Sequence, residues 1–498
     1  MTDTFFGWRR LGRAALGLAL ATGAAQAAAQ AAVCPDGASF DSSLGFCSDG
    51  TNAWGPFTQA MTDNCIKWGG GPACTELRAA PVGGSTLALQ RWSVSFTRSL
   101  RGTASCPTGT VADTAYDGRC VEKLPGVNNM YGGFNAGLVA RCQELGGGSP
   151  CLSTRWNADF YMRVSFGQRL QRNLAAAFAG SGVPSVAVAV STPDQGEITA
   201  AAGVASPTSN PVNPHVHLYR WASVTKHLNA ALIMRMQDAG LLNIDQRLAQ
   251  HMSVPGLAYG STMTIRQMLN NSAGVADYLN DSSAFINSTS VWRTYTNADI
   301  VGYINGTGAS FAPGAAYKYS NGGHFLLGML AEQKLGLPLD TAFQQWLFQP
   351  LGLQNIWLDM HSSPSQRIPN LVESSRAYAY SPTSVKAAGA VVATPVDMVK
   401  FIRALHTGQV VSAASLSAMK QPQARSSGYG LATILFKSPS GTPYFGHTGT
   451  ILNYKSQVYY VPSMDVAVAL TMNGYPTASK LDEIKAAVYN TVAGRYGR

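Results

Sequence analysis

All cysteines of this chain lie in its first third, and this distribution restricts the fold more than any other feature. The eight cysteines fall between Cys34 and Cys151, and none occurs in the rest of the 498 residues. A short Gly-rich segment cannot bury enough apolar surface to fold alone, so an even number of cysteines predicts disulfide crosslinks. We expect a small disulfide-rich domain over residues 33–160 and a cysteine-free domain over residues 161–498 with room for a large core.

The cysteine-rich segment also contains an internal repeat. The strings CPDGASFDSSLGFC and CIKWGGGPAC are echoed by CPTGTVADTAYDGRC and CQELGGGSPC, and an Arg-Trp pair follows each half. This self-similarity predicts two related modules, at about 34–95 and 106–160. The simplest disulfide pairing closes each short loop, although the sequence does not prove it. That pairing joins Cys34 with Cys47, Cys65 with Cys74, Cys106 with Cys120 and Cys142 with Cys151.

Zinc binding is the alternative interpretation of these cysteines. Against it, their intervals lack the paired C-x2-C spacing of structural zinc sites. Such modules could bind a cell-wall or glycan surface, and a stabilising or spacing role fits the sequence equally well. Nothing in them indicates catalysis.

The first 32 residues have the layout of a bacterial secretory signal peptide. Arg9, Arg10 and Arg13 precede the apolar stretch AALGLALATGAA, and small residues end the segment. This pattern predicts a secreted or periplasmic protein, in a compartment where disulfides persist. No later run approaches the roughly 20 apolar residues of a membrane helix, so no transmembrane span is expected after signal cleavage.

The charge of the chain does not indicate a nucleic-acid partner. The net charge is +10, but only 12% of the residues are charged and no run of Lys or Arg occurs. A nucleic-acid site would need such basic residues gathered in one place. We interpret the positive charge as a mild excess that is spread over a solvated surface.

The predicted secondary structure of the cysteine-free part changes along its length. Its patterns predict a helix and two strands first, a long helical region next, and four strands and a last helix at the end. This order indicates an α/β (α+β) fold, in which both ends complete an antiparallel sheet flanked by terminal helices and containing a large helical insertion. The expected elements include SFGQRLQRNLAAAFAG, PSVAVAVST, EITAAAGVA, MTIRQMLNNSAG, PLDTAFQQWLFQPLG, TPVDMVKFIRALHTG, SGYGLATILF, TPYFGH, YKSQVYYVP, MDVAVALTMN and SKLDEIKAAVYNTVAG.

A serine and a lysine stand three residues apart at the start of the largely apolar stretch SVTKHLNAALIMRMQ. If a helix begins at Ser223, Lys226 lies one turn further on the same face, where its amine can approach the serine hydroxyl. A desolvated, neutral lysine can accept the serine proton and make Ser223 a nucleophile. The simpler alternative is that Ser223 caps the helix and Lys226 is a solvated residue of its first turn.

Three short patterns, Ser-x-x-Lys, Tyr-x-Asn and His-Thr-Gly, each occur more than once in the chain, so the surrounding sequence has to decide between the copies. A second Ser-x-x-Lys, from Ser417 to Lys420, is followed by QPQARSSG rather than by a long apolar helix. Of the four Tyr-x-Asn patterns, the one at Tyr319 lies in a turn before a new helix, and we interpret the other three as packing or surface residues. Of the two His-Thr-Gly patterns, His406 ends a helical segment, whereas His447 lies between two strand-like segments.

Five strings in the right order resemble a known family: YRWASVTK, TIRQMLNNSAG, PGAAYKYSNGGHFLLGMLAE, AGAVVATPVDMVKF and YFGHTGTILNYKSQVYYVP. From about Ser165 to its end, the chain resembles the serine beta-lactamase-like hydrolases. This group contains class C beta-lactamases, D-alanyl-D-alanine carboxypeptidases, D-aminopeptidases and related esterases. The resemblance implies a beta-lactamase/transpeptidase-like fold and does not extend to the cysteine-rich part.

The resemblance also implies roles for the matching residues. Ser223 would be the acylated nucleophile and Lys226 its activating partner. Tyr319 would take or return the proton at the leaving group, and Asn321 would position Lys226 and the substrate. Acylation followed by hydrolysis with water would need neither a metal nor a cofactor.

The third motif departs from the lactamase pattern. His447 and Gly449 occupy it, and the backbone amides of Ser223 and Thr450 would form the oxyanion hole. Lactamases usually have a lysine where His447 stands, and its fixed charge helps to hold a substrate carboxylate. A histidine, with a reference pKa near ~6.5, is mostly neutral at physiological pH, so this attraction is weaker. The histidine is similar to what esterases and D-aminopeptidases of the group contain.

We therefore predict a secreted serine hydrolase that cleaves an ester or amide bond in a small molecule or peptide through an acyl-enzyme on Ser223. Within the family, the alternative is a class C-like beta-lactamase or a penicillin-binding peptidase. An alternative of another class is a catalytically silent protein that binds a surface or glycan through the cysteine-rich repeats. His215 and His217 alternate as metal ligands on a strand would, but they lack a third partner, so no metal is expected.

Overall fold

The computed structural model describes residues 34–55, 79–93 and 109–152 with gaps, and residues 155–497 apart from 207–210, 289–291 and 380. The chain forms two compact units, Met1–Ala136 and Gly137–Arg498. The signal peptide expected over residues 1–32 lies outside the described residues.

The first unit contains short antiparallel strands. β1, β2, β3 and β6 form one sheet in that order, β4 pairs with β5, and β8 pairs with both β7 and β9. The β1–β2 and β7–β8 hairpins occupy corresponding parts of the two expected modules, and the repeat itself remains a prediction. The strands are β1 (Ser39–Asp41), β2 (Phe46–Ser48), β3 (Asn52–Gly55), β4 (Ala79–Val82), β5 (Ser85–Ala88), β6 (Gln90–Ser93), β7 (Thr110–Asp113), β8 (Arg119–Glu122) and β9 (Asn129–Tyr131).

Two of the expected disulfides are confirmed, Cys34–Cys47 and Cys142–Cys151. Cys120 is also disulfide-bonded, and there is no free cysteine in the described part of the chain. A cysteine binds zinc only as a thiolate, which a disulfide does not provide, so the zinc interpretation is wrong for these five cysteines. The other three lie outside the described residues: Cys65, Cys74 and Cys106.

The second unit begins before the boundary expected at residue 160. Strand β10 (Arg155–Asn157) leads directly into helix α4 (Ala158–Phe178). The buried Trp156 ring lies 6.2 Å from the ring of Phe160 and 6.3 Å from that of Tyr161. These contacts pack the end of the expected second module against the helix that follows it.

The core of the second unit contains a six-stranded antiparallel sheet in the order β12-β11-β19-β18-β17-β16. The β11–β19 pairing joins the strands that precede the helical region to those that follow it. This arrangement confirms the expected sheet, which both ends of the cysteine-free part complete. The strands are β11 (Ser185–Thr192), β12 (Gly196–Gly203), β16 (Ile434–Lys437), β17 (Pro443–Ile451), β18 (Tyr454–Val461) and β19 (Val466–Asn473).

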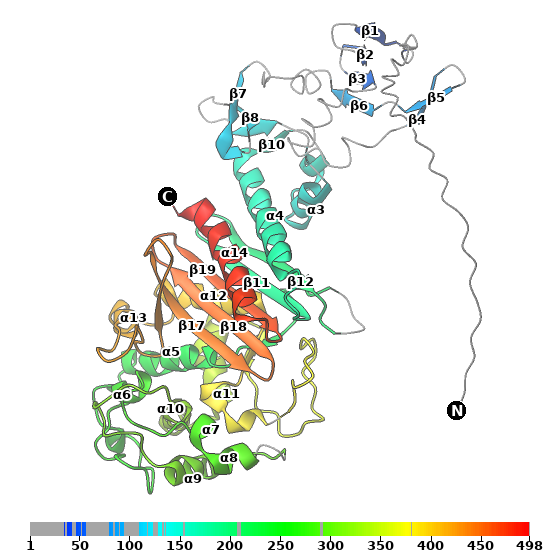
Figure 1. The fold of residues 1–498 in the computed structure, drawn as a ribbon. Coiled ribbons are helices and arrows are strands. Elements are labelled where there is room, and N and C mark those ends of the chain that lie inside the picture. The colour runs from blue at the N-terminus through cyan, green and yellow to red at the C-terminus, as the bar shows by residue number, and fades with distance from the viewer. Residues whose placement is uncertain are drawn as a thin grey trace, which may run out of the picture. The chain divides into compact units, whose positions relative to one another are not determined.

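Helices cover both faces of this sheet (Figure 1). On β11, Val188 and Val190 belong to the core beneath α4 and α14 (Ala478–Tyr496). Ala189, between them, points to the opposite core, which contains α12 (Pro395–His406). Side chains alternate between the faces of a strand, so the larger valines fill one layer and the small alanine lets α12 approach on the other side.

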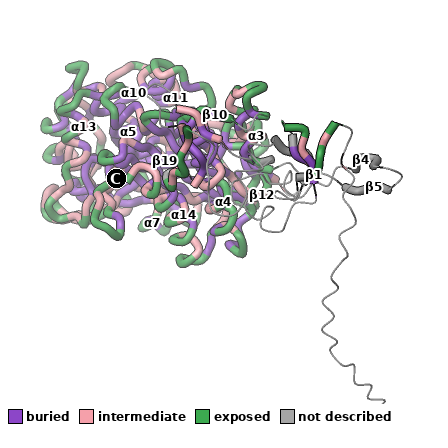
Figure 2. The backbone as a smooth tube through the Cα atoms, turned by 90° about the horizontal axis from the view of Figure 1, so that it is seen from above, coloured by how far each residue is buried: buried purple, intermediate pink, exposed green. Residues whose placement is uncertain are grey.

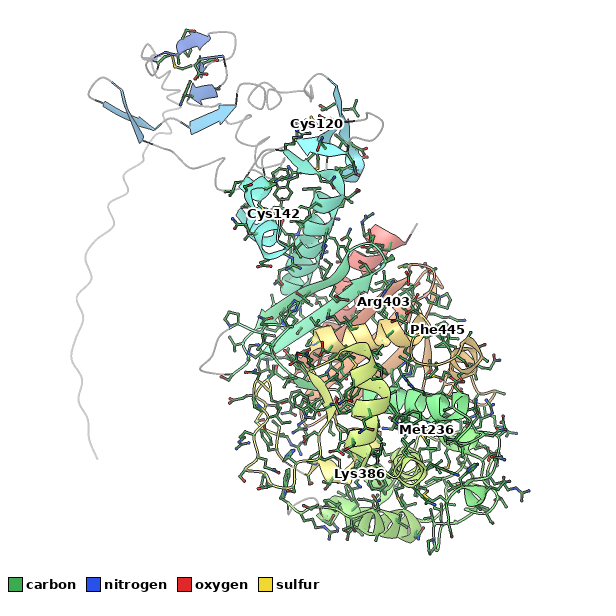
Figure 3. The ribbon with its side chains drawn as sticks, turned by 180° about the vertical axis from the view of Figure 1, so that it is seen from behind. Cys120, Cys142, Met236, Lys386, Arg403 and Phe445 are labelled. Atoms are coloured by element: carbon green, nitrogen blue, oxygen red, sulfur yellow. A yellow bond between two sulfur atoms is a disulfide. The ribbon has the colours of Figure 1, made fainter. Side chains whose placement is uncertain are left out.

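Arg403 fastens α12 to the sheet (Figure 3). Its guanidinium donates to the backbone oxygen of Asp465 at 2.7 Å and to the carboxylate of Asp465 at 2.8 Å, in the turn before β19. Helix α12 ends at His406, and Gly408 follows with a φ of 80°. The first His-Thr-Gly is therefore a helix stop, as expected.

The helical region forms a lobe around α5 (Val224–Asp238), which is buried on nearly all sides (Figure 2). A helix with so little exposed surface belongs in the interior of a large core. A small sheet in the order β13-β15-β14 accompanies the lobe. Its strands are β13 (Tyr219–Arg220), β14 (Ile356–Leu358) and β15 (Val391–Ala393), and the other helices of the chain are α3 (Ala136–Glu144), α6 (Ile265–Leu269), α7 (Tyr278–Asp281), α8 (Ser283–Ser288), α9 (Asn297–Thr307), α10 (Asn321–Leu335), α11 (Leu339–Phe343) and α13 (Ala413–Lys420).

Some boundaries differ from the expected ones. Helix α4 begins at Ala158 rather than near Ser165, because the Asn157 side chain caps it by accepting from two backbone amides of the first turn. Strand β17 continues past His447 to Ile451. Among the described residues, no helix is both long enough and apolar enough to cross a membrane.

Candidate active site

Ser223 lies where strand β13 turns into helix α5. The Trp221 amide donates to the Val391 carbonyl in β15 at 2.9 Å, which fixes the chain just before the turn. Ala222 has a φ of 51°, a strained left-handed conformation of the kind that clusters at functional sites. Ser223 occupies the N-cap position of α5, but its side chain makes no capping hydrogen bond. The cap interpretation is therefore wrong, and the hydroxyl has other partners.

Lys226 is fully buried, and its amine contacts three oxygen atoms. Nζ lies 3.1 Å from Ser223 Oγ, 2.7 Å from Asn321 Oδ1 and 2.6 Å from the carbonyl oxygen of Ala388. Burial lowers the pKa of Lys226 to about 7, against the opposing effect of the Asp277 charge. The solvated alternative for Lys226 is therefore wrong, and much of this amine is neutral near pH 7.

The neutral amine has a defined orientation. It carries two hydrogens and one lone pair, while the oxygens of Asn321 and Ala388 can only accept hydrogen bonds. The two hydrogens therefore point to Asn321 and Ala388, and the lone pair faces the Ser223 hydroxyl. The geometry allows Lys226 to accept the serine proton.

Asp277 holds Asn321 in place. Its Oδ1 accepts from the Asn321 backbone amide at 3.3 Å and from Asn321 Nδ2 at 2.8 Å, which turns the amide oxygen of Asn321 toward Lys226. The other carboxylate oxygen accepts from Asn280 at 2.7 Å. Sequence reasoning missed Asp277. The available signal was one acidic residue within the otherwise apolar stretch AGVADYL, where a carboxylate needs partners.

Tyr319 joins the cluster from the turn before α10. Its hydroxyl lies close enough to Ser223 for that side chain to favour the ionised form slightly, and Lys226 Nζ lies 4.9 Å from the centre of its ring. Burial raises the pKa of Tyr319, so the resting group is a neutral phenol that can both donate and accept. The other tyrosines of the Tyr-x-Asn patterns pack in or against the hydrophobic core: Tyr278, Tyr295 and Tyr303.

His447 lies on β17, with its ring 6.5 Å from that of Tyr319 and only 2% of its surface exposed. Its Nδ1 is 2.6 Å from the Thr448 carbonyl oxygen and its Nε2 is 3.0 Å from the Tyr429 hydroxyl. A carbonyl can only accept, so Nδ1 carries the proton and Nε2 accepts from Tyr429. Burial lowers the pKa of His447 to about 3, and the nearby Lys226 adds to this effect. The imidazole is therefore neutral, and Tyr429 is a second residue that sequence reasoning missed.

Gly449 allows β17 to approach the Ser223 turn closely. A Cβ at this position would lie 2.2 Å from the Trp221 carbonyl oxygen and 2.5 Å from Ser456 Oγ, so a larger residue does not fit. This contact places the third motif beside the start of α5. The glycine is therefore required by packing.

The backbone amide of Thr450 faces the open edge of β17. The β17–β18 hairpin closes with the pair Ile451 and Tyr454, and both turn residues between them, Leu452 and Asn453, have positive φ. Such a two-residue turn has a hydrogen-bonded closing pair, so the next pair back, which contains Thr450, points its amide away from β18. Strand β16 pairs only with the first part of β17 and leaves this edge free.

A cavity of about 310 Å³ opens at Ser223. Asn321 and Thr450 lie in its wall, so the cavity borders the proposed oxyanion position as well as the nucleophile. Apolar side chains form much of the remaining wall. They are Leu279, Phe285, Ile286, Val385, Ile451 and Leu452.

His215 and His217, considered as metal ligands, follow Asn213 in the chain, and the ring of one of them bonds back to it. His217 Nδ1 accepts from the Asn213 backbone amide at 2.8 Å. The described residues contain no group of three or more His, Cys, Asp or Glu arranged to hold a metal ion.

An antiparallel sheet beside a helical lobe, with a serine, a buried lysine and a tyrosine meeting between them, is the architecture of the beta-lactamase-like serine hydrolases. Comparison with known protein families agrees with this class. Residues 170–492 match the family described as Beta-lactamase, and this match covers more than half of the chain. The protein belongs to the Beta-lactamase family.

The individual relatives share less than a third of their aligned residues with this chain. Penicillin-binding protein 4 of Amycolatopsis lactamdurans is 28% identical over 306 residues, which cover 56% of this chain and 77% of the relative. Esterase EstB of Burkholderia gladioli is 28% identical over 148 residues, which cover 28% of this chain and 38% of the relative. The solved D-amino acid amidase from Ochrobactrum anthropi SV3 is similar with a TM-score of 0.57 at 24% identity, over 66% of this chain and 99% of that protein. At this identity the structural likeness supports the fold alone.

Proposed function

We propose that this protein hydrolyses an ester or amide bond through an acyl-enzyme on Ser223. The observation that carries the proposal is the position of the Lys226 amine, 3.1 Å from Ser223 Oγ. Asn321 and Ala388 accept hydrogen bonds from the two hydrogens of the neutral amine. A buried lysine whose lone pair faces a serine hydroxyl is the arrangement that activates a weak nucleophile.

The proposed reaction begins when neutral Lys226 takes the proton of Ser223 and Oγ bonds to the substrate carbonyl carbon. The carbonyl oxygen becomes negative and is stabilised by the backbone amides of Ser223 and Thr450. As the tetrahedral intermediate collapses, the bond to the leaving group breaks and the Tyr319 hydroxyl donates a proton to that group. Lys226 returns a proton to Tyr319, which restores the neutral amine.

Deacylation uses water in the same site. A water molecule bonds to the acyl carbon, its proton passes to the Tyr319 and Lys226 pair, and the bond to Ser223 Oγ breaks. Ser223 regains its proton and the product leaves as a carboxylic acid. Apart from this water molecule, every group that acts on the substrate in the proposed reaction belongs to the chain.

Two observations support ester or amide substrates over a specialised beta-lactamase role. His447 is neutral and buried, so it offers no fixed charge to a substrate carboxylate. The relatives named above include an esterase and an amidase as well as a penicillin-binding protein. The disulfides, together with the signal peptide expected from the sequence, support export to an oxidising compartment such as the periplasm.

Hydrolysis of 4-nitrophenyl hexanoate tests the proposal. The Ser223→Ala variant should lose roughly a thousandfold or more in kcat/KM, because no other group can form the acyl-enzyme. Ser417→Ala is the matched control, since it removes the serine of the second Ser-x-x-Lys and should keep wild-type rates. Equal rates in the wild type and Ser223→Ala would refute the proposal.

A further inference from the structure

The described wall of the cavity at Ser223 contains a positively charged side chain but no negatively charged one. Of the described residues in its wall, Arg376 is the one with a charged side chain, and the others are apolar residues, backbone segments and neutral polar groups. None of these described wall residues is Asp or Glu. Among the described residues of the wall, a substrate group therefore meets one positively charged side chain and no negatively charged one.

Arg376 has no acidic partner among the described residues. Its backbone is fixed, because its amide donates to Ser374 Oγ at 3.3 Å and its carbonyl accepts from the Ala379 amide at 3.0 Å. Other arginines of the same unit form ion pairs, as in the buried Arg220–Asp359 pair at 2.7 Å. The guanidinium of Arg376 is exposed and available to a ligand.

The position of the cavity identifies the part of the substrate that it receives. Tyr319, the proposed proton donor to the leaving group, is not in the cavity wall, and neither are Tyr429 and His447 beside it. The leaving group therefore departs on the side of Tyr319. The acyl group, which stays bonded to Ser223, occupies the cavity.

We propose that Arg376 makes this hydrolase select acyl groups that end in a carboxylate. The inference rests on the proposed acyl-enzyme function and adds the class of acyl group. The apolar wall formed by Leu279, Phe285 and Ile286 suits a short aliphatic segment between the scissile carbonyl and the anionic end. The planar guanidinium binds a carboxylate with two hydrogen bonds, and a cationic acyl group would meet only repulsion.

Three 4-nitrophenyl esters with matched acyl chains test this selection. The adipate monoester ends in a carboxylate, the hexanoate ends in a methyl group, and the 6-(trimethylammonio)hexanoate ends in a cation. We expect kcat/KM to fall in that order, with the adipate about tenfold or more above the hexanoate. The preference should weaken as salt is added, because the pair forms at an exposed side chain.

Variants locate the preference at Arg376. Arg376→Ala should lower the adipate-to-hexanoate ratio of kcat/KM to near one, and Arg376→Glu should reverse the order of the anionic and cationic esters. Arg367→Ala is the control. Arg367 is also exposed and lies in the same segment of the chain, but it lines a different cavity. It should keep the wild-type ratio.

The outcomes separate the two proposals. If all three esters are cleaved at similar rates, or if the Arg376 variants keep the wild-type ratio, the carboxylate selection is wrong while the acyl-enzyme proposal stands. If the wild type cleaves none of the three esters, both proposals are wrong.

Discussion

At the scale of single residues, the proposed chemistry depends on Lys226. In water a lysine keeps its proton far above neutral pH, which would leave Ser223 without a base. Here the loss of water outweighs the stabilising charge of Asp277, and the pKa falls to about 7. Asn321 and Ala388 then orient the neutral amine.

The pH dependence of activity follows from this pKa. The proposed base works only when it is neutral, so kcat/KM should rise with pH up to about 7 and stay level above it. Below pH 7 the rate should fall about tenfold for each pH unit, because protonated Lys226 cannot accept a proton. The measurement is kcat/KM for hexanoate ester hydrolysis between about pH 5 and pH 9.

The Lys226→Arg variant should be inactive across this range, since a guanidinium does not lose its proton. Lys420→Gln, which changes the lysine of the second Ser-x-x-Lys, should keep the wild-type profile. A flat profile in the wild type, or activity in Lys226→Arg, would contradict the role given to Lys226.

The cluster of Ser223, Lys226, Tyr319 and Asn321 could be predicted because each lies in a recognisable string and at a helix start. Asp277, Tyr429 and Arg376 could not be assigned in this way. They reach the site from loops whose paths depend on tertiary packing, and a single residue in such a loop has no periodic pattern around it.

At the scale of elements, the proposed site requires β17 to lie in contact with the turn that begins α5. Gly449 makes this approach possible, since its missing side chain leaves room for the Trp221 carbonyl. The same contact sets the distance between the Thr450 amide and the Ser223 amide. Packing and the proposed oxyanion hole therefore depend on one glycine.

The Gly449→Ala variant should lose both stability and activity. The added methyl group has to push β17 away from the backbone of Trp221, at a cost of about 1–3 kcal/mol. A lower Tm, together with a kcat/KM at least about tenfold lower, should be seen by calorimetry and ester hydrolysis.

Gly302→Ala is the matched control for this change. Gly302 lies within α9, and a Cβ there meets no atom within 4 Å. Alanine should keep or raise the Tm at such a helical position. Wild-type Tm and activity in Gly449→Ala would contradict the close contact between β17 and α5.

The order and type of most elements could be predicted from hydrophobic periodicity, but some of their lengths could not. Helix α4 begins well before Ser165, because the Asn157 cap lies within the segment assigned to the cysteine-rich part. Strand β17 extends past His447, where Gly449 weakens the strand pattern but pairing with β18 continues.

At the scale of the whole molecule, the cysteine distribution correctly predicted disulfides at Cys34–Cys47 and Cys142–Cys151. The two compact units meet between Ala136 and Gly137, so the second of these disulfides lies in the second unit. Trp156 also packs against Phe160 and Tyr161 of α4, and a cysteine count contains no information about such contacts.

The most direct test of the central claim is intact-protein mass spectrometry after treatment with a fluorophosphonate, followed by peptide mapping. Our account predicts one added phosphonyl group per chain, located on Ser223, with no addition in Ser223→Ala. An unmodified wild-type protein, or a label on another residue, would contradict the assignment of Ser223 as the nucleophile.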